Sequence, residues 1–444
     1  MITWRPAALL AAGAVVVAVL PWPWAGVAVL AAAVATLCVL DAALAAAPGD
    51  VVLRREGARQ VRLDDTTEVT LVVTNTGVRP LRAQIRDAWV PSAGATPYAQ
   101  RVDLDPDESA RLVTTLYPTR RGDRPAARAT VRSYGPLGFA YRQPSGRRAD
   151  AMTPGWRLRV LPRFASRCFL AEKMARLRVV DGMVVTRGRG QGTEFDTLRE
   201  YVIGDDVRSI DWRASARRSD VIVRTWRPER DRRVLCVIDT GRTSAARVAT
   251  VIGDRTLDEP RLDAAIDAAL LLATLANRAG DRVDLLAIDT TVRAAVEGGT
   301  GRSLLPRLTN AMAPLQPALV ETDFGLVAGE VLRRERKRAL VVLFTALEAG
   351  ALGEGLLPVL TQLTARHKVV LAAVHDPAVA ELAGRRGDVE GVYAAAAAHR
   401  TLAERDRLRA ALGRHQVEVV DAPADVFASR VADAYLTMKA AGRL

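Results

Sequence analysis

The chain has 444 residues, of which 49% are hydrophobic and 25% charged, and at about 150 residues per domain this length predicts two or three domains. The composition excludes a long disordered chain, a collagen-like fibre and a disulfide-stapled scaffold. The net charge of +13 is compatible with nucleic-acid binding or with an anionic membrane surface, and the total does not choose between them. The three cysteines lie far apart in the sequence, so neither a zinc ribbon nor a disulfide framework is expected.

Two apolar runs near the N-terminus, 7–20 and 25–40, predict a pair of transmembrane helices. The Pro-Trp-Pro-Trp link at 21–24 cannot continue a helix, and its indoles suit a lipid–water interface. A secretory signal peptide is the alternative, and the second apolar run argues against it. Arginines precede the first run and follow the second, so the positive-inside rule predicts both ends in the cytoplasm. We therefore expect residues 1–48 to form a helical hairpin in the inner (plasma) membrane, which makes the protein multi-pass with most of the chain cytoplasmic.

Short strands are expected next. Residues 68–74 alternate between apolar and polar side chains with period two, and Asn75 to Gly77 supply a turn. The stretches 81–90 and 110–117 show the same pattern, and helical periodicity is absent. Residues 49–150 are therefore predicted to form a small antiparallel β-sandwich of the Ig-like kind.

The following segment, 151–233, is predicted to be a charged linker. A helix is expected over 164–180, and Gly188, Gly190 and Gly192 open an irregular loop. These glycines follow no predicted strand and no Lys-Ser/Thr completes a P-loop, so they do not predict a nucleotide site.

From residue 234 onward, strand and helix patterns alternate. Fully apolar strands between amphipathic helices are typical of a parallel sheet covered on both faces, with ligands bound at the carboxyl ends of the strands. Residues 234–444 are therefore predicted to form an α/β, Rossmann-like domain with a central, mostly parallel sheet. The expected strands are 234–238, 283–288, 339–344, 369–374 and 417–420, and the expected helices are 261–279, 322–336, 356–366, 394–412 and 426–441.

One stretch of the charged segment is a distinctive motif, which we call the hallmark segment (residues 194–217). Its patterns G-x-E-F, L-R-E-Y, G-D-D-x-R-x-I-D-W and A-S-A-R occur in this order, and the chain resembles the DUF58 family of bacterial proteins in them. The residues that carry the resemblance are Glu194, Phe195, Leu198, Arg199, Glu200, Tyr201, Gly204, Asp205, Asp206, Arg208, Ile210, Asp211, Trp212, Ser215, Ala216 and Arg217.

The acids of the hallmark segment allow two interpretations. Clustered around a divalent cation, Glu194, Asp205, Asp206 and Asp211 would suit a metal-dependent hydrolase or nuclease. Interspersed arginines favour the other interpretation, in which acids and bases pair in a structural or partner-binding network. No catalytic constellation stands out elsewhere, so an enzyme is not expected.

The family resemblance further implies that the C-terminal domain is von Willebrand A-like. Such domains hold Mg²⁺ with a D-x-S-x-S loop, a later Thr and an Asp after the fourth strand. Asp239, Thr243 and Thr322 match three of these ligands here, whereas Gly241 replaces a Ser and Ala346 stands where the Asp would be.

The metal site is therefore expected to be degenerate, with Mg²⁺ as its only candidate cofactor. Glu348 or Asp323 could compensate for the lost ligands. A degenerate site that still marks a protein-binding face is the favoured interpretation.

The charge distribution and the resemblance together predict a function. Residues 51–233 carry a net charge of +14 and residues 234–444 a net charge of zero, which indicates a basic region beside an anionic inner leaflet and a neutral domain facing partners. Nucleic-acid binding is not expected because aromatic residues make up only 5%. The resemblance implies a membrane-anchored scaffold or adaptor that works with a MoxR-type AAA+ ATPase in the assembly or maturation of envelope-associated complexes.

Overall fold

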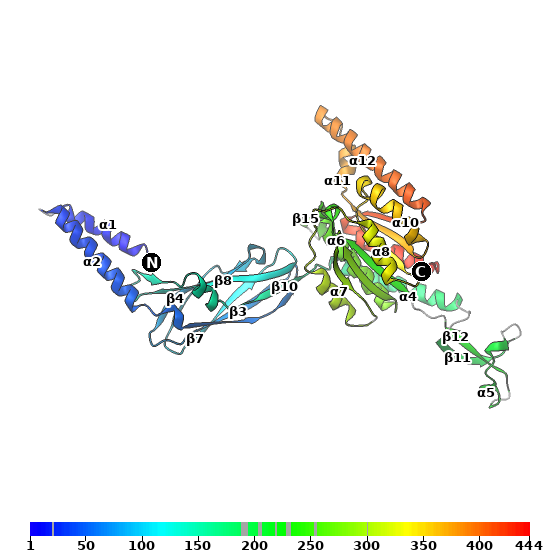
Figure 1. Cartoon of the computed structure of the whole chain (residues 1–444), viewed down its shortest axis with the longest axis horizontal. Coiled ribbons are helices and arrows are strands. Elements are labelled where there is room, and N and C mark those ends of the chain that lie inside the picture. The colour runs from blue at the N-terminus through cyan, green and yellow to red at the C-terminus, as the bar shows by residue number, and fades with distance from the viewer. Residues whose placement is uncertain are drawn as a thin grey trace. The chain divides into compact units, whose positions relative to one another are not determined.

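The computed structural model describes the whole chain except residues 20–21, 188–193, 203–206, 218–219, 228–231, 253–254 and 300. The chain divides into two compact units, Met1–Leu161 and Pro162–Leu444 (Figure 1). Together they make a multidomain, mixed α/β protein with several sheets, as the sequence predicted.

The first unit begins with two apolar helices, α1 (Arg5–Val17) and α2 (Pro23–Leu44), which lie side by side (Figure 1). A Cβ added to Gly13 of α1 would lie 2.6 Å from Cδ2 of Leu30, so the side chain of Leu30 in α2 packs directly over this glycine. One segment, Pro23–Asp50, is long and apolar enough to cross a membrane, and only 17% of its most apolar window is buried. α1 is apolar but shorter, so length and composition support one of the two predicted spans.

Both helices are tied to a single loop of the first unit, residues 135–141, which we call the Asp41 loop. Asp41 of α2 is fully buried, and its carboxylate accepts three backbone hydrogen bonds, from Leu137 (2.7 Å), Phe139 (2.7 Å) and Ala140 (2.8 Å). Arg5, the first residue of α1, donates from Nη1 to the carbonyl oxygen of Leu137 at 2.9 Å. The loop therefore holds the start of α1 and the end of α2 at one place.

The rest of the first unit is a β-sandwich. One sheet has the strand order β1-β3-β7-β5 and the other β2-β10-β8-β4-β6, with β9 paired to β8. All pairs are antiparallel except β10 with β2. The strands are β1 (Val51–Gly57), β2 (Gln60–Arg62), β3 (Thr67–Asn75), β4 (Leu81–Trp89), β5 (Ala95–Thr96), β6 (Gln100–Leu104), β7 (Ser109–Leu116), β8 (Gly122–Tyr134), β9 (Tyr141–Arg142) and β10 (Arg157–Leu161), with short helices η1 (Pro48–Asp50), η2 (Pro91–Ala93) and α3 (Arg147–Met152).

Alternation along the strands builds the core of the sandwich. In β3, Val69, Leu71 and Val73 are buried while the residues between them are not. Leu71 and Val73 share an apolar cluster with Ile85 and Val131 of the other sheet, and Val69 belongs to a second cluster. β10 lies beyond residue 150, where the sequence analysis ended the sandwich, and its pairing with β2 and β8 extends the unit to Leu161.

The second unit opens with η3 (Ala165–Phe169) and α4 (Leu170–Arg187), which cover the predicted helix 164–180. The glycine-containing loop predicted after it lies largely outside the described residues. The segment beyond, expected to be irregular, instead forms a two-stranded antiparallel sheet of β11 (Glu194–Glu200) and β12 (Ile222–Arg227), with η4 (Val207–Ser209) and α5 (Trp212–Ser215) between them. Backbone pairing between distant strands explains the difference, because neither strand shows an alternating pattern strong enough to predict alone.

The centre of the second unit is a six-stranded sheet of order β17-β16-β13-β18-β19-β20. All its pairs are parallel except β17 with β16. Helices cover both faces, as Figure 1 shows, and each face has its own apolar core. The strands are β13 (Arg233–Asp239), β16 (Arg282–Ile288), β17 (Val292–Val296), β18 (Leu340–Phe344), β19 (Lys368–His375) and β20 (Glu418–Pro423), and the helices are α6 (Arg261–Arg278), α7 (Leu304–Met312), α8 (Phe324–Arg334), α9 (Ala349–Ala351), η6 (Leu352–Leu356), α10 (Leu357–Thr364), α11 (Ala378–Ala383), α12 (Val389–Arg414) and α13 (Ala424–Ala440).

The five predicted strands of this sheet are confirmed by β13, β16, β18, β19 and β20. The edge strand β17 and the hairpin β14 (Arg247–Ile252) and β15 (Arg255–Pro260), with η5 (Arg242–Ala245) before it, were not predicted. β13 lies between β16 and β18, so the chain leaves it first to one side and later to the other. The carboxyl end of β13 is thus the point where the strand order reverses, the usual ligand position in such sheets.

Candidate functional site

Asp239 ends strand β13 at this reversal point, and it is the centre of the candidate site. Its side chain is buried, with the residue 2% exposed. Oδ1 accepts hydrogen bonds from the backbone N–H of Gly241 (2.7 Å) and the hydroxyl of Thr322. Oδ2 accepts from the hydroxyls of Thr243 (3.0 Å) and Thr345 (2.6 Å). The carboxylate therefore joins three separate loops at the carboxyl edge of the sheet.

The three residues predicted to bind metal are thus brought together, since Thr243 and Thr322 both contact Asp239. Thr345, which follows β18 directly, was not predicted as part of this site. The sequence could have indicated it, because a hydroxyl residue directly after a buried parallel strand lies at the same edge of the sheet as Asp239.

The predicted substitutes for the missing ligands have other partners. Asp323 caps α8 by accepting the N–H of Leu326 at 2.9 Å. Glu348 pairs with Arg261. Ala346 is buried and offers no ligand atom.

Steric contact at Gly241 prevents a return of the missing Ser. A Cβ at this position would lie 2.2 Å from Oγ1 of Thr322 and 2.9 Å from the carbonyl oxygen of Val320. The Thr322–Asp239 hydrogen bond occupies the space that a side chain at 241 would need. Gly241 is therefore part of the packing of the site as well as a lost ligand.

A small cavity of about 20 Å³ lies beside Asp239 and is lined by Thr243, Thr345 and Arg261 among others. This volume admits one water molecule at most, since a water needs roughly 10–15 Å³. Mg²⁺ prefers six oxygen ligands and retains several waters. The cavity has only one carboxylate, has no room for a hydrated ion, and carries the guanidinium of Arg261 on its wall. This lining does not fit Mg²⁺.

A second buried carboxylate supports the site from the neighbouring strand. Asp289, just after β16, accepts from the hydroxyl of Thr240 (3.0 Å), the backbone N–H of Thr291 (3.1 Å) and Nε of Arg293 (2.6 Å). Burial raises the pKa of Asp289, but the hydrogen bonds from Arg293, Thr291 and Thr240 outweigh it and hold the pKa below the usual value. Asp289 is therefore ionised at neutral pH and fixes the residue next to Asp239.

The hallmark segment forms a separate structure, the β11–β12 hairpin. Asp211 caps α5 by accepting the backbone N–H groups of Arg213 and Ala214, both at 3.0 Å. The hydroxyl of Ser215 donates to the carbonyl oxygen of Asp211 (2.8 Å) and accepts the N–H of Ile222 (2.8 Å). These two hallmark residues therefore attach α5 to β12, which is a structural role.

The other described hallmark residues lie around this hairpin. Trp212 is 70% exposed, and Leu198 is also exposed. Ile210 forms a bridge with Val223, and the N–H of Tyr201 donates to the carbonyl oxygen of Val221. Nη1 of Arg199 donates to the carbonyl oxygen of Glu200, and Ala216 and Arg217 are exposed after α5.

The remaining hallmark predictions cannot be placed in full. Gly204, Asp205 and Asp206 lie outside the described residues, as do the side chains of Glu194, Phe195 and Arg208. Within the part of the chain that the structure describes, no three His, Cys, Asp or Glu side chains gather in a way that could hold a metal ion.

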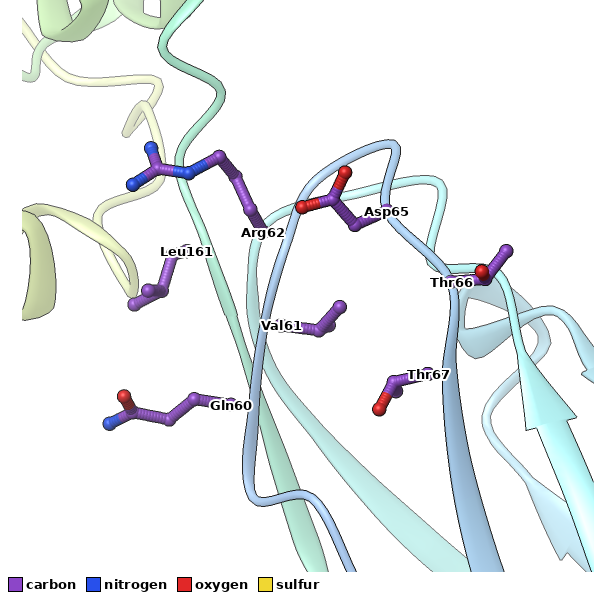
Figure 2. Close-up of a pocket in the computed structure, with 7 residues that line it drawn as sticks. All are labelled: Gln60, Val61, Arg62, Asp65, Thr66, Thr67 and Leu161. Carbon is purple, nitrogen blue, oxygen red and sulfur yellow. The ribbon is translucent and has the colours of Figure 1, made fainter.

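Two further features of the chain are a buried thiol and an open surface hollow. Burial raises the pKa of the Cys236 thiol to about 12, so this residue in the middle of β13 is not a nucleophile. An open hollow of about 560 Å³ lies at one end of the sandwich, and Figure 2 shows side chains such as Arg62, Asp65 and Thr66 spread along it without converging on one point. Neither feature assembles the groups that a catalytic centre needs.

Comparisons with known proteins agree with the sequence motif. The family model described as "Protein of unknown function DUF58" matches residues 197–419. Two uncharacterised mycobacterial proteins, Rv1480 of Mycobacterium tuberculosis and Mb1516 of Mycobacterium bovis, are each 28% identical over 196 residues. The match covers 44% of this chain and 58% of each relative, so it spans little more than half of their length.

Solved structures match the chain only in part. The CARDB domain of the PF1109 protein from Pyrococcus furiosus is 19% identical, with a TM-score of 0.20, and the match covers 25% of this chain and 87% of that domain. Native alpha-2-macroglobulin from Escherichia coli is 19% identical, with a TM-score of 0.21, and the match covers 26% of this chain and 17% of the other.

Proposed function

The chain belongs to the DUF58 family, and from that premise we propose that it is a membrane-anchored cytoplasmic adaptor that binds another protein through its second unit. The proposal has three parts: a two-helix anchor, a von Willebrand A-like second unit and a partner of the MoxR-type AAA+ ATPase class. The client would be a complex at the cell envelope that the ATPase assembles or matures.

The arrangement of the N-terminal helices supports the anchor. The Asp41 loop contacts Arg5 at the start of α1 and Asp41 near the end of α2. Two antiparallel helices whose outer ends meet one loop have those ends on the same side of a bilayer. A hairpin with both ends in the cytoplasm is therefore proposed, although α1 is shorter than α2.

The Asp239 carboxylate is the observation that carries the adaptor role. Four hydrogen bonds from three loops fix the carboxyl edge of the sheet in one conformation. A surface that is already ordered loses little conformational entropy when a partner binds. The poor fit to Mg²⁺ favours a metal-independent contact with the partner over one bridged by a cation.

Residues at the rim of this edge can be changed without disturbing the hydrogen bonds to the Asp239 carboxylate. Arg242 pairs with Glu321 at the surface, and both side chains are more than half exposed. Exchanging them, as Arg242→Glu with Glu321→Arg, keeps the internal pair and reverses the charges that a partner meets. The matched control exchanges Arg400 and Glu404, an exposed pair on α12.

The experiment uses the full chain in its native membrane, with chemical crosslinking, affinity capture and identification of captured ATPases. We expect an AAA+ ATPase with the wild type and the α12 control, and at least a fivefold lower yield with the rim exchange. Failure of the wild type to capture an ATPase contradicts the partner assignment. Equal yields from both exchanges contradict the assignment of the surface.

The anchor has its own measurement. A reporter enzyme that is active only in the cytoplasm, fused after Leu444, should be active, and the fusion should resist extraction from membranes by alkaline carbonate. Activity of a periplasmic reporter at the same position contradicts the topology.

A further inference from the structure

The net charge of zero over residues 234–444 conceals a cationic edge of the central sheet. In a parallel sheet the strands begin at one edge, and here Arg338 precedes β18 and Lys368 begins β19 at that edge. Gln416 precedes β20, and Arg443 follows α13. These side chains line an open cavity of about 510 Å³, which we call the cationic notch; its residues are Arg338, Lys368, Gln416, Val417, Glu418 and Arg443.

Two guanidinium groups of the notch lack protein partners. Among the described residues, the side chains of Arg338 and Arg443 make no hydrogen bond or ion pair, and both are exposed. Lys368 donates from Nζ to the carbonyl oxygen of Gln416 at 2.9 Å, which uses one of its three N–H groups. Glu418 is the one acid in the lining, so the notch keeps an excess of two positive charges.

Three other cations near this edge are neutralised by acidic partners. Arg233 pairs with Glu335, and Arg282 pairs with Asp284. Lys439 is buried against Asp281. These three cations each have an acidic partner, whereas Arg338 and Arg443 have none among the described residues.

The surroundings strengthen the positive potential. Exposed basic residues lie within two positions of the lining residues in three separate loops, so they add to the same field. They are Arg336, Lys337, Arg366 and Arg414.

The donor set selects the ligand chemistry. Planar guanidiniums offer paired N–H donors that match the oxygens of a phosphate, and a lysine adds a point charge. No Phe, Tyr or Trp lines the notch, so the stacking groups used to hold nucleic-acid bases are absent from this lining. We propose that the cationic notch binds a phosphoryl group, from a soluble phosphate or from the headgroup of an anionic phospholipid.

The test uses the full chain in micelles of a neutral detergent, at constant ionic strength set with chloride. One arm titrates inorganic phosphate, and the other titrates a water-soluble short-chain phosphatidylglycerol against the matching phosphatidylcholine. Calorimetry reports the dissociation constant in each arm. The notch variant is Arg338→Gln with Arg443→Gln, and the control is Arg407→Gln with Arg430→Gln, two exposed arginines of α12 and α13 that do not line the notch.

We expect the notch variant to raise the dissociation constant at least tenfold and the control to change it less than twofold. Binding of inorganic phosphate identifies a soluble source, and binding of phosphatidylglycerol without inorganic phosphate identifies a lipid source. Absence of binding in both arms, or equal loss in the two variants, overturns the proposal. If the double variant unfolds, Arg443→Gln alone keeps the test open, because Arg443 is exposed after the end of α13 and its replacement should still weaken binding about threefold.

Discussion

The Asp41 carboxylate offers a sharp test of how the apolar helices are attached to the sandwich. Replacement of Asp41 by Asn keeps the shape of the side chain but removes the charge and one of its two acceptor oxygens. At least one of the backbone N–H groups of Leu137, Phe139 and Ala140 then loses its acceptor, and the others lose a charged one.

The magnitude follows from the number of bonds. A hydrogen bond to a charged group is worth about 1.5–3 kcal/mol, so three such bonds at the lower bound contribute about 4.5 kcal/mol, most of which Asn would lose. Since Asp41 is fully buried, water does not replace them. A loss of about 4 kcal/mol in local stability corresponds to roughly a thousandfold change in the opening equilibrium.

Hydrogen–deuterium exchange of the full chain in lipid nanodiscs measures this local opening directly. In the Asp41→Asn variant we expect amide exchange across residues 137–140 to accelerate by two to three orders of magnitude, about the factor estimated above. The control is Asp103→Asn, because Asp103 is exposed and its ion pair with Arg82 is long, at 3.6 Å. Unchanged exchange in the loop, or equal acceleration in the control, would refute the assignment of Asp41 as the attachment point.

Three further changes test the second unit. Burial raises the pKa of Asp267 from 3.8 to about 6, so its contribution to stability is full below pH 3.8 and is lost as the pH rises through 6. Asp267→Asn should remove this pH dependence and raise the unfolding free energy at pH 7.5 by up to about 3 kcal/mol. Thermal unfolding of the wild type and the variant, below pH 3.8 and at pH 7.5, measures the difference. Lys439→Met should cost about 3–5 kcal/mol because it leaves Asp281 buried without its cation, and the added change Asp281→Asn should recover most of the loss in denaturant unfolding; no recovery would contradict an electrostatic cause. Gly241→Ser should lower the thermal midpoint through its clash with Thr322, at a cost of about 1–3 kcal/mol, and a midpoint equal to that of the wild type would show that the site has room for a serine.

Local patterns in the sequence were sufficient to predict the order of the elements. The fully apolar runs at 234–238 and 339–344 are short and alternate with amphipathic helices, which predicts buried strands of a parallel sheet. The pairing of Asp239 with Thr243 was also predictable, because the two residues are four positions apart in one loop and the family pattern places them together. Composition likewise indicated an apolar, membrane-compatible N-terminus, of which one segment has the necessary length.

Contacts between distant residues depended on the tertiary structure. Thr345 reaches Asp239 because parallel strands place their carboxyl ends side by side, although 106 positions separate the two residues. The three bonds to Asp41 come from a loop almost a hundred residues away, and the sequence shows only an isolated acid in an apolar run. The net charge of zero over residues 234–444 could not reveal that Arg338 and Arg443 lie together at one edge of the sheet, because a sum over residues carries no positions. A sequence specifies its strands and helices through neighbours a few residues apart, whereas the site and the cationic notch depend on which strand ends the fold brings to the same edge.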